Sequence, residues 1–297
     1  MLARLLRLIL LFELFAYLAG GVLLVKSAGW RPGGAILSMI FLALGWRAGV
    51  ILKTYVLALA DRGRVPGGQR LGVRRGLLEG LREVGAFVVL SGVQPFERMI
   101  LGRDEPSRPA ADQVPLLLIH GYCCNRGFWW WLKPRLEAGG RSVATLTLEP
   151  LFGNIDGYAE QVARRVDALC RETGAEKVML VGHSMGGLVS RAYLRRYGEA
   201  RVARLVTLGT PHRGSVMARF GLGRNSRQME SGSAWLRDLE LSPLLVPCIA
   251  CYSSGDNLVM PAAAMLAGAE NRALPGVGHL AMSISPLVLA ALLSASA

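Results

Sequence analysis

Disulfide bridges and metal clusters have little support in this sequence of 297 residues. It contains five cysteines, Cys123, Cys124, Cys170, Cys248 and Cys251, whose spacing shows neither a paired framework nor a two-plus-two set of metal ligands. We therefore expect buried or loop thiols in a reducing compartment. We also expect no metal and no other cofactor.

Acidic residues are scarce as well. Asp and Glu total 21 against 34 Lys and Arg, which leaves a formal net charge of +13. Such an excess can indicate nucleic-acid binding, but here the charges are scattered, Arg dominates, and no basic-aromatic recognition motif is present. We therefore expect no nucleic-acid partner and favour an anionic membrane surface.

Long apolar runs, by contrast, are plentiful near the N-terminus. Hydrophobic residues make up 52% of the chain, which is above the share of roughly 45–50% found in soluble domains. The mean hydropathy is +0.36. Residues 5–25 form a run that only Arg7 and Glu13 interrupt, and a helix of this length extends roughly 31 Å. No clean signal-peptide cleavage site follows, so we expect an uncleaved helix.

A second apolar run occupies residues 33–56. It carries Arg47 and Lys53 near its far end, where long cationic side chains can reach the membrane surface. We predict a hairpin of two membrane helices in residues 1–60; the alternative is one span followed by an interfacial helix. Arginines flank both ends of the hairpin, which predicts anchoring in a bacterial inner membrane with the folded domain of residues 112–297 in the cytosol. A single inserted span would instead place that domain in the periplasm.

The rest of the chain divides into a linker and a folded domain. Residues 61–111 are basic and contain Gly/Arg-rich and Pro-rich stretches, so we interpret them as a juxtamembrane linker. Within this linker, residues 77–90 can form an amphipathic helix that lies against the membrane or the domain. Residues 112–297 form the expected folded domain.

Short apolar runs alternate with helical patterns in this domain. The expected strands are residues 114–119, 142–148, 177–181, 202–208 and 246–252. Helices are expected at residues 158–172 and 185–197. The alternation predicts an α/β fold with an open, doubly wound and mostly parallel sheet, whose reactive groups lie at the carboxyl ends of the strands.

The sequence G-H-S-M-G at residues 182–186 has the pattern of a nucleophile elbow. A strand pattern precedes it and a helical pattern follows it, which is the strand–turn–helix context that the elbow requires. The flanking glycines fit because strand and helix approach closely around the strained turn. We therefore predict that Ser184 is the nucleophile.

A serine hydroxyl needs a base held by a carboxylate, and in this fold the chain order is Ser, then Asp or Glu, then His. Only His212 and His279 follow the serine at a distance. His279 lies in a glycine-rich loop after an expected last short strand, whereas His212 precedes Asp256, which ends a strand and begins a loop. We predict a triad of Ser184, Asp256 and His279.

The oxyanion that forms on a substrate carbonyl needs preorganised N–H donors. One expected donor is the backbone amide of Met185, directly after the nucleophile. The other is the amide of Tyr122, in the loop that follows the first buried strand. His120 and Gly121 support this loop, and we expect His120 to brace it by hydrogen bonds rather than to transfer protons.

Five blocks of sequence, H-G-Y-C-C-N-R-G-F-W, G-H-S-M-G-G-L, G-T-P-H-R-G-S, S-G-D-N-L-V-M-P and P-G-V-G-H-L, occur in this order. Over residues 112–295 the chain thereby resembles the bacterial lipases and esterases of the α/β-hydrolase family. The resemblance implies the α/β-hydrolase fold with a short cap, and a serine hydrolase activity. The N-terminal apolar region and the lack of a disulfide pair depart from the secreted lipases, and no carboxylate cluster matches the calcium site of some relatives.

A cap insertion is expected at about residues 212–241, over the serine. Apolar side chains that can line an acyl pocket there are Met217, Phe220, Leu222, Met229 and Trp235. The alternative is ordinary packing of a short helical cap. Four adjacent aromatic residues, Phe128, Trp129, Trp130 and Trp131, cannot all point inward from a helix, which also favours a hydrophobic substrate.

These observations predict a serine hydrolase that cleaves apolar carboxylic esters or acyl lipids through an acyl-enzyme on Ser184. An amidase, a thioesterase and an acyltransferase use the same triad, so the fold does not separate them from an esterase. A catalytically silent membrane accessory protein is a third possibility. The complete triad argues against it, because such proteins usually lose a triad member.

Overall fold

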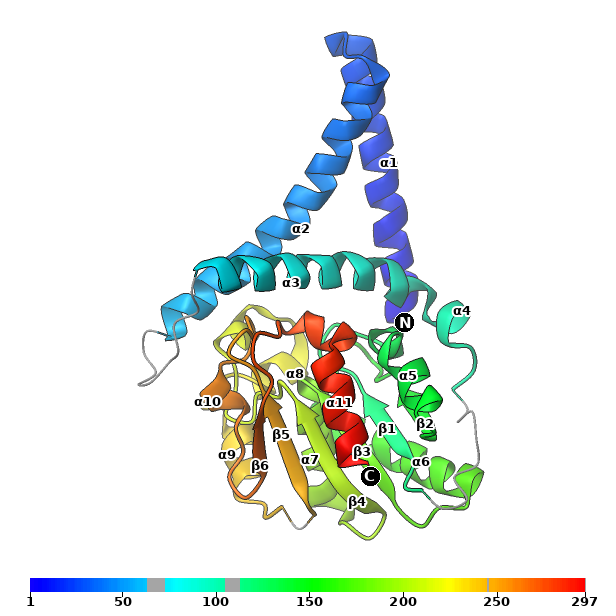
Figure 1. The fold of residues 1–297 in the computed structure, drawn as a ribbon, viewed down its shortest axis with the longest axis vertical. Coiled ribbons are helices and arrows are strands. Elements are labelled where there is room, and N and C mark those ends of the chain that lie inside the picture. Colours follow the sequence, from blue (N-terminus) through cyan, green and yellow to red (C-terminus); the bar gives the residue numbers. More distant parts are fainter. Residues whose placement is uncertain (63–72, 105–112, 245, 297) are drawn as a thin grey trace.

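A parallel sheet forms the centre of the chain in the computed structural model, which describes residues 1–62, 73–104, 113–244 and 246–296 (Figure 1). Within these residues the sheet has six strands, in the order β2-β1-β3-β4-β5-β6. The strands are β1 (Leu116–Ile119), β2 (Val143–Leu146), β3 (Val178–His183), β4 (Val202–Leu208), β5 (Cys248–Tyr252) and β6 (Glu270–Ala273). All neighbouring strands are parallel, which confirms the doubly wound sheet that the sequence predicts.

Helices cover both faces of the sheet because successive residues of a strand point to opposite sides. On one face, Leu117 and Leu180 pack against α6 (Ile155–Thr173) and α7 (Met185–Tyr197). On the other face, their neighbours in the strands, among them Leu116, Leu118, Met179 and Val181, pack against α5 (Leu132–Ala138) and α11 (Pro286–Ala295). Each face thus has its own apolar core.

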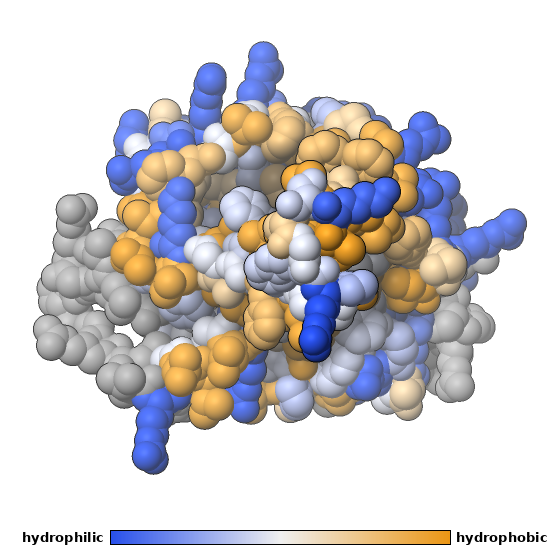
Figure 2. Space-filling view, turned by 90° about the horizontal axis from the view of Figure 1, so that it is seen from above, coloured by the Kyte–Doolittle hydropathy of each residue, from blue (hydrophilic) through white to orange (hydrophobic). Residues whose placement is uncertain are grey.

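The first two helices form a hairpin that projects from this domain (Figure 1). Helix α1 (Leu2–Ala28) and helix α2 (Pro32–Arg62) are joined at Gly29, whose φ of 69° lies in the left-handed region. Both are long and apolar enough to cross a membrane, and the most apolar 18-residue part of α1 buries none of its residues inside the protein. Seen from the hairpin end, many of the surface side chains are apolar (Figure 2). The two expected N-terminal helices are therefore present, each a few residues longer than predicted.

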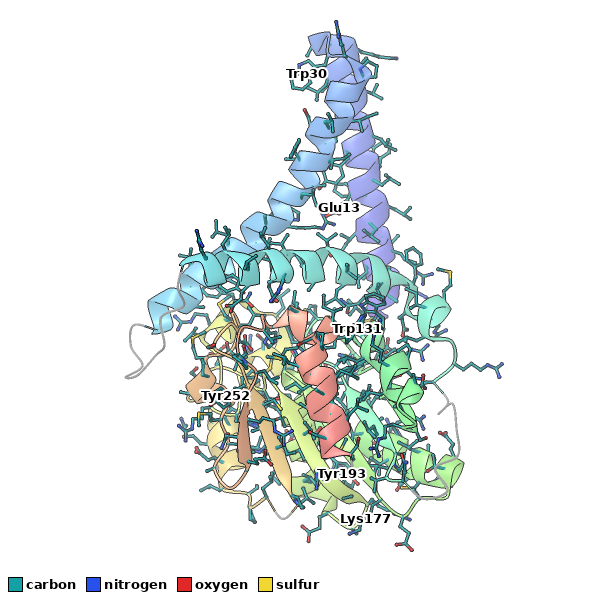
Figure 3. The ribbon with its side chains drawn as sticks, viewed as in Figure 1. Glu13, Trp30, Trp131, Lys177, Tyr193 and Tyr252 are labelled. Atoms are coloured by element: carbon teal, nitrogen blue, oxygen red, sulfur yellow. The ribbon has the colours of Figure 1, made fainter. Side chains whose placement is uncertain are left out.

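The sequence suggests that the side chain of Arg47 extends to a membrane surface, but the structure places it elsewhere. Its guanidinium forms an ion pair with Glu13 of α1, between the two helices of the hairpin. Figure 3 shows Glu13 between α1 and α2, well below Trp30 at the turn. The sequence alone does not predict this ion pair, because the two residues lie 34 positions apart in the chain.

Helix α3 (Val73–Val93) crosses over the end of the domain that faces the hairpin (Figure 1). By composition, residues 76–101 could also cross a membrane, yet α3 packs on the η4 turn (Leu280–Ile284) and on the η1 turn (Gln94–Phe96). One face of α3 is buried, and the other exposes apolar side chains at Leu77, Leu78 and Leu81. We therefore treat α3 as a helix that lies on the domain rather than as a membrane span.

Helix α3 occupies much of the segment that the sequence presents as a linker. The helix begins earlier and ends later than the expected residues 77–90, and it is followed by η1 and α4 (Glu97–Leu101). The remaining linker residues 63–72 and 105–112 lie outside the described parts of the chain.

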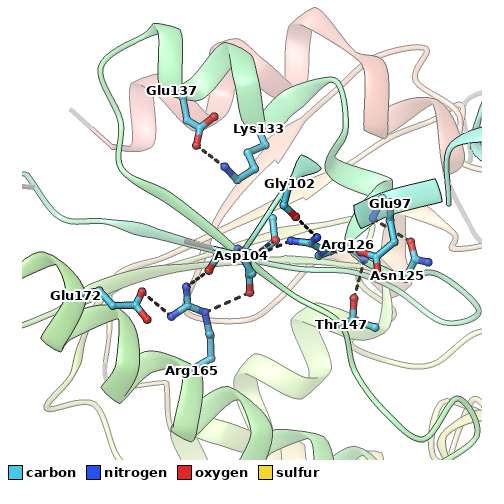
Figure 4. A network of polar contacts seen from close by, with 12 residues as sticks. Glu97, Gly102, Asp104, Asn125, Arg126, Lys133, Glu137, Thr147, Arg165 and Glu172 are labelled. Carbon is cyan, nitrogen blue, oxygen red and sulfur yellow. Dashed lines mark hydrogen bonds and ion pairs between the residues drawn. The ribbon is translucent and has the colours of Figure 1, made fainter. Parts of the chain in front are cut away.

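A network of charged side chains connects residues 97–104 to the domain (Figure 4). Arg126 pairs with Glu97 and donates to the carbonyl of Gly102. Asp104 accepts from the backbone and hydroxyl of Thr145 in β2, at 2.9 and 2.6 Å, and contacts Arg165 of α6 at 3.4 Å. Residues 97–104 are thereby joined to the turn after β1, to β2 and to α6.

Smaller elements complete the domain. Between β4 and β5 lie η3 (Val216–Phe220), α8 (Gly223–Gln228) and α9 (Ala234–Glu240), which correspond to the expected cap. The chain also contains η2 (Arg126–Trp129) after β1 and α10 (Pro261–Ala264) after β5.

Candidate active site

Ser184 lies at a sharp turn between β3 and α7. Its backbone has φ 53° and ψ −123°, a conformation that costs energy for a residue with a side chain and that clusters at functional sites. A Cβ atom on Gly186 would lie 2.2 Å from the carbonyl oxygen of Ile119, and one on Gly182 would lie 2.4 Å from the amide of Gly187. The two glycines therefore allow strand and helix to meet closely enough for this turn.

Asp256 and His279 meet in the interior of the domain. Asp256 follows β5 and His279 follows β6, and both side chains are buried. The Nδ1 atom of His279 lies 2.9 Å from Oδ2 of Asp256. The other carboxylate oxygen accepts from the backbone N–H groups of Leu258 and Val259, each at 2.8 Å. The aspartate is thus held in place, and Nδ1–H of the histidine donates to it, which leaves Nε2 as the basic nitrogen.

The charge around His279 favours its protonated form. Burial lowers the pKa of the imidazole, but the Asp256 carboxylate and its hydrogen bond raise it, and Glu83 adds to that increase. The net effect is a pKa above the ordinary value of 6.5. A histidine in this setting can accept a proton from a hydroxyl and hold the resulting positive charge.

His183 connects the serine to the histidine loop. It directly precedes Ser184, and its Nε2–H donates to the carbonyl of His279 at 3.1 Å. Its ring lies 4.6 Å from the His279 ring and stacks on Phe128 at 4.1 Å. Burial lowers the pKa of His183 far below the ordinary value, so this imidazole is neutral. Its contacts place the end of β3 against the loop of His279.

The loop after β1 closely approaches the serine. A Cβ on Gly121 would lie 2.9 Å from Cβ of Ser184. Tyr122 follows in this loop, and Met185 is the first residue of α7, so the two expected oxyanion donors belong to segments that flank the serine.

His120 sits beneath this loop with both ring nitrogens in hydrogen bonds. Nε2 accepts from the amide of Leu148 at 2.9 Å, which leaves Nδ1–H to donate to the carbonyl of Gly121 at 2.8 Å. Burial lowers the pKa of His120 to about 4, so the ring is neutral at pH 7. This arrangement agrees with a bracing role for His120.

His212 occupies a separate place under α7. Its Nδ1 faces Arg191 at 3.4 Å, and its Nε2 lies 3.1 Å from the hydroxyl of Thr207. Burial and the positive charge of Arg191 lower the pKa of His212 far below the ordinary value. These contacts hold a neutral histidine in the core.

The side chains nominated for an acyl pocket differ in their surroundings. Phe220 and Leu222 are 63% and 66% exposed, Met217 is half-buried, and Trp235 donates from its indole to Asp156 of α6 at 2.8 Å. Met229 is buried in the core that lies under α6 and α7.

One cap contact does reach the loop after β1. The Tyr122 hydroxyl donates to the carbonyl of Leu222 at 2.9 Å and accepts from its amide at 2.7 Å. The side chain of Tyr122 therefore fastens the cap above the loop whose amide is an expected oxyanion donor.

Three polar residues near His279 were not found from the sequence: Glu83 of α3, Asn257 and Thr54 of α2. The backbone amides of Leu280 and Ala281 donate to Glu83, and the Asn257 side chain links the amide of His279 to the Thr54 hydroxyl. A signal for Glu83 exists, since Glu79 and Glu83 continue the helical spacing of Ala86 and Leu90 along one buried face.

The described parts of the chain contain no group of three or more His, Cys, Asp or Glu side chains that could hold a metal ion. The five cysteines are free thiols; Cys123 is exposed and the others are buried. Near Ser184 the structure thus brings together the residue types that acyl transfer requires, a hydroxyl, a histidine paired with a carboxylate, and backbone N–H groups.

Comparisons with known proteins find similarity to hydrolases. The alpha/beta hydrolase fold family matches residues 114–244. A triacylglycerol lipase of Pseudarthrobacter phenanthrenivorans is 36% identical over 119 residues, which are 37% of this chain and 37% of the relative. A triacylglycerol lipase of Burkholderia plantarii is also 36% identical over 119 residues, which are 37% of this chain and 33% of the relative.

The chain therefore spans little more than a third of the length of these curated relatives. Among solved structures, a mature lipase of Bacillus licheniformis shares the fold with a TM-score of 0.57 at 19% identity, over 64% of this chain and 96% of that one.

Proposed function

The chain has the α/β-hydrolase fold, and on this premise we propose that it is a serine hydrolase that cleaves apolar carboxylic esters or acyl lipids. The observation that carries the proposal is the buried contact of 2.9 Å between Asp256 and His279, next to the strained turn of Ser184. Similarity to triacylglycerol lipases supports ester hydrolysis as the reaction.

The proposed reaction begins when Nε2 of His279 takes the hydroxyl proton of Ser184, whose Oγ attacks the ester carbonyl. The carbonyl carbon becomes tetrahedral and its oxygen becomes an oxyanion, which the amides of Met185 and Tyr122 stabilise. Collapse breaks the C–O bond to the alcohol, and His279 returns the proton to that leaving group. A water molecule then attacks the acyl-enzyme by the same sequence, which releases the carboxylic acid and restores Ser184.

The preference for apolar substrates rests on the surroundings of the site. The cap presents exposed Phe220 and Leu222, and α2 lies close to the cap turn η3. An acyl chain that leaves a membrane would therefore meet apolar side chains of the cap.

We further propose that the α1–α2 hairpin spans a bacterial inner membrane. Large apolar side chains are exposed along both helices, which suits contact with lipid rather than water. The amine of Met1 pairs with Glu149 of the catalytic domain, and Thr54 near the end of α2 bonds to Asn257. Both ends of the hairpin thus reach the domain, so two crossings would leave them on one side of the membrane.

The test is chemical labelling and turnover of the detergent-solubilised protein. We expect a fluorophosphonate probe to label Ser184, and Ser184→Ala to abolish labelling and to reduce turnover by at least about 10⁴-fold. Ser294→Ala, at an exposed serine of α11, is the matched control and should behave as the unchanged protein. Labelling that persists in Ser184→Ala contradicts the assignment.

The substrate class needs a second measurement. A panel of acyl esters, amides and thioesters with matched acyl chains should give the highest kcat/KM for the esters. A higher value for amides or thioesters would leave the triad in place but overturn the ester assignment.

A further inference from the structure

Helix α3 presents two carboxylates on the face that it buries against the domain. Glu79 and Glu83 stand one turn apart, and Ala86 and Leu90 continue the same face. The Glu83 side chain is fully buried. A buried carboxylate costs free energy unless hydrogen bonds satisfy it, so the position of Glu83 requires specific partners.

Those partners are the residues that directly follow His279. Oε1 of Glu83 accepts from the amide of Leu280 at 2.7 Å, and Oε2 accepts from the amide of Ala281 at 2.9 Å. On the other side of the histidine, a Cβ atom on Gly278 would lie 2.2 Å from Oε2 of Glu83. The carboxylate therefore contacts the backbone both before and after His279.

The other end of α3 leads to a contact with the loop after β1. Gln94, in the η1 turn that follows α3, accepts from the amide of Asn125 at 3.0 Å, and its carbonyl accepts from the Asn125 side chain at 2.9 Å. Asn125 lies three residues after Tyr122, whose amide is a proposed oxyanion donor. One continuous helical segment thus touches the loops of two parts of the site.

We propose that Glu83 is a positioning residue of the active site, which fixes the backbone on both sides of His279 and, when ionised, places a negative charge near its imidazole. The proposal rests on the assignment of His279 as the base of a serine hydrolase. Glu83 does not touch the substrate; it acts through the histidine.

The charges of Glu83 and His279 each shift the pKa of the other group. Burial raises the pKa of Glu83 to about 7, against the opposing hydrogen bonds from Leu280 and Ala281 and the attraction of His279. Among the residues that the structure describes, Asp256, Glu79, His183 and Tyr55 are further ionisable groups in this region. Because the anionic form of Glu83 raises the pKa of His279, its loss should lower the pH at which His279 becomes protonated.

The experiment compares Glu83→Gln and Glu83→Asp in the full-length, detergent-solubilised protein. Fluorophosphonate titration counts the competent sites, so kcat is expressed per labelled serine. In Glu83→Gln an NH₂ group replaces one acceptor and faces a backbone N–H, and the charge is lost. We expect kcat to fall by about 10-fold to 100-fold and the acid limb of the kcat/KM profile to move to lower pH.

The second variant separates the effect of the charge from the effect of side-chain length. Glu83→Asp keeps the charge but shortens the side chain, so kcat should fall while the acid limb stays near that of the unchanged protein. It also provides the measurement if Glu83→Gln does not fold. Glu160→Gln, at an exposed carboxylate on α6, is the control and should alter neither quantity.

A purely structural role predicts a different result. In that case Glu83→Gln lowers the melting temperature and the number of labelled sites, but the kcat per site stays within twofold and the acid limb does not move. That outcome overturns the proposal while the triad stands. Persistent labelling in Ser184→Ala overturns the serine hydrolase assignment instead, so the two failures are distinguishable.

Discussion

Glu13 of α1 and Arg47 of α2 form an ion pair in which Nη2 of the arginine lies 2.6 Å from Oε2 of the glutamate. The guanidinium also donates to the carbonyl of Ala43 at 3.2 Å. Most of the large neighbouring side chains on both helices are apolar and exposed. In an apolar environment each of these charges depends on the other, because an isolated ion there is costly.

Removal of one partner should therefore destabilise the hairpin more than removal of both. We expect Arg47→Ala to reduce the free energy of unfolding by about 3 kcal/mol, as measured by denaturation in lipid bicelles. The double variant Glu13→Leu with Arg47→Leu should recover most of this loss. Equal stability of the single and double variants would show that an unpaired Glu13 costs nothing, which would contradict the prediction.

The two histidines that follow Ser184 should respond differently to substitution. His279→Ala should reduce turnover as much as Ser184→Ala does, since triad members act as a unit. His212→Ala should keep substantial activity, because that side chain bonds to Thr207 and Arg191 rather than to Asp256. Its expected effect is a loss of stability of about 1–3 kcal/mol from the unpaired buried groups.

Measurements of steady-state turnover and thermal unfolding on both variants test which histidine is the base. An inactive but folded His212→Ala protein, together with an active His279→Ala protein, would reverse the assignment of the base.

The pH dependence of catalysis should follow the protonation of His279. The base acts only when neutral, and Asp256 raises its pKa above 6.5, so kcat/KM should fall as the pH drops through that raised value. Asp256→Asn removes the charge that raises this pKa, so the acid limb should move to lower pH. Turnover should fall by about 10³-fold to 10⁴-fold. An acid limb that Asp256→Asn leaves in place would contradict the pairing.

The orientation of the protein can be tested with reporter fusions after residue 111. Two crossings with both arginine-rich ends retained inside predict a fluorescent cytosolic reporter and an inactive periplasmic phosphatase reporter at this junction. Fusions after Gly29, at the turn of the hairpin, are the matched control and should give the reverse pattern. An active phosphatase at residue 111 would instead indicate a single crossing.

The central sheet could be predicted because its strands carry an unambiguous pattern. Strand β4 has the bounds expected from its apolar run, and α7 begins directly after the elbow as expected. Strand β6 is mostly exposed and has the sequence Glu-Asn-Arg-Ala, so no apolar run marks it and only its place before the histidine loop suggested a strand. Edge strands of this kind depend on their neighbours more than on their own residues.

Helix α3 was only partly foreseen for a related reason. The sequence around Val73–Val93 is amphipathic, but whether its apolar face meets lipid or protein depends on contacts with η4, which is distant in the chain. The same limit applies to Glu83, Asn257 and Thr54. Their roles arise from hydrogen bonds between residues 22 to 203 positions apart, and a single sequence carries no local pattern for such pairs.

The N-terminal segment and the hydrolase domain are not interchangeable modules. Sequence similarity to the family begins at residue 114, yet the backbone around His279 is completed by Glu83 and, through Asn257, by Thr54. A fragment cut at the family boundary would expose the amides of Leu280 and Ala281 to water. A domain that begins at residue 114 would therefore lack contacts that hold the backbone around His279 in this structure.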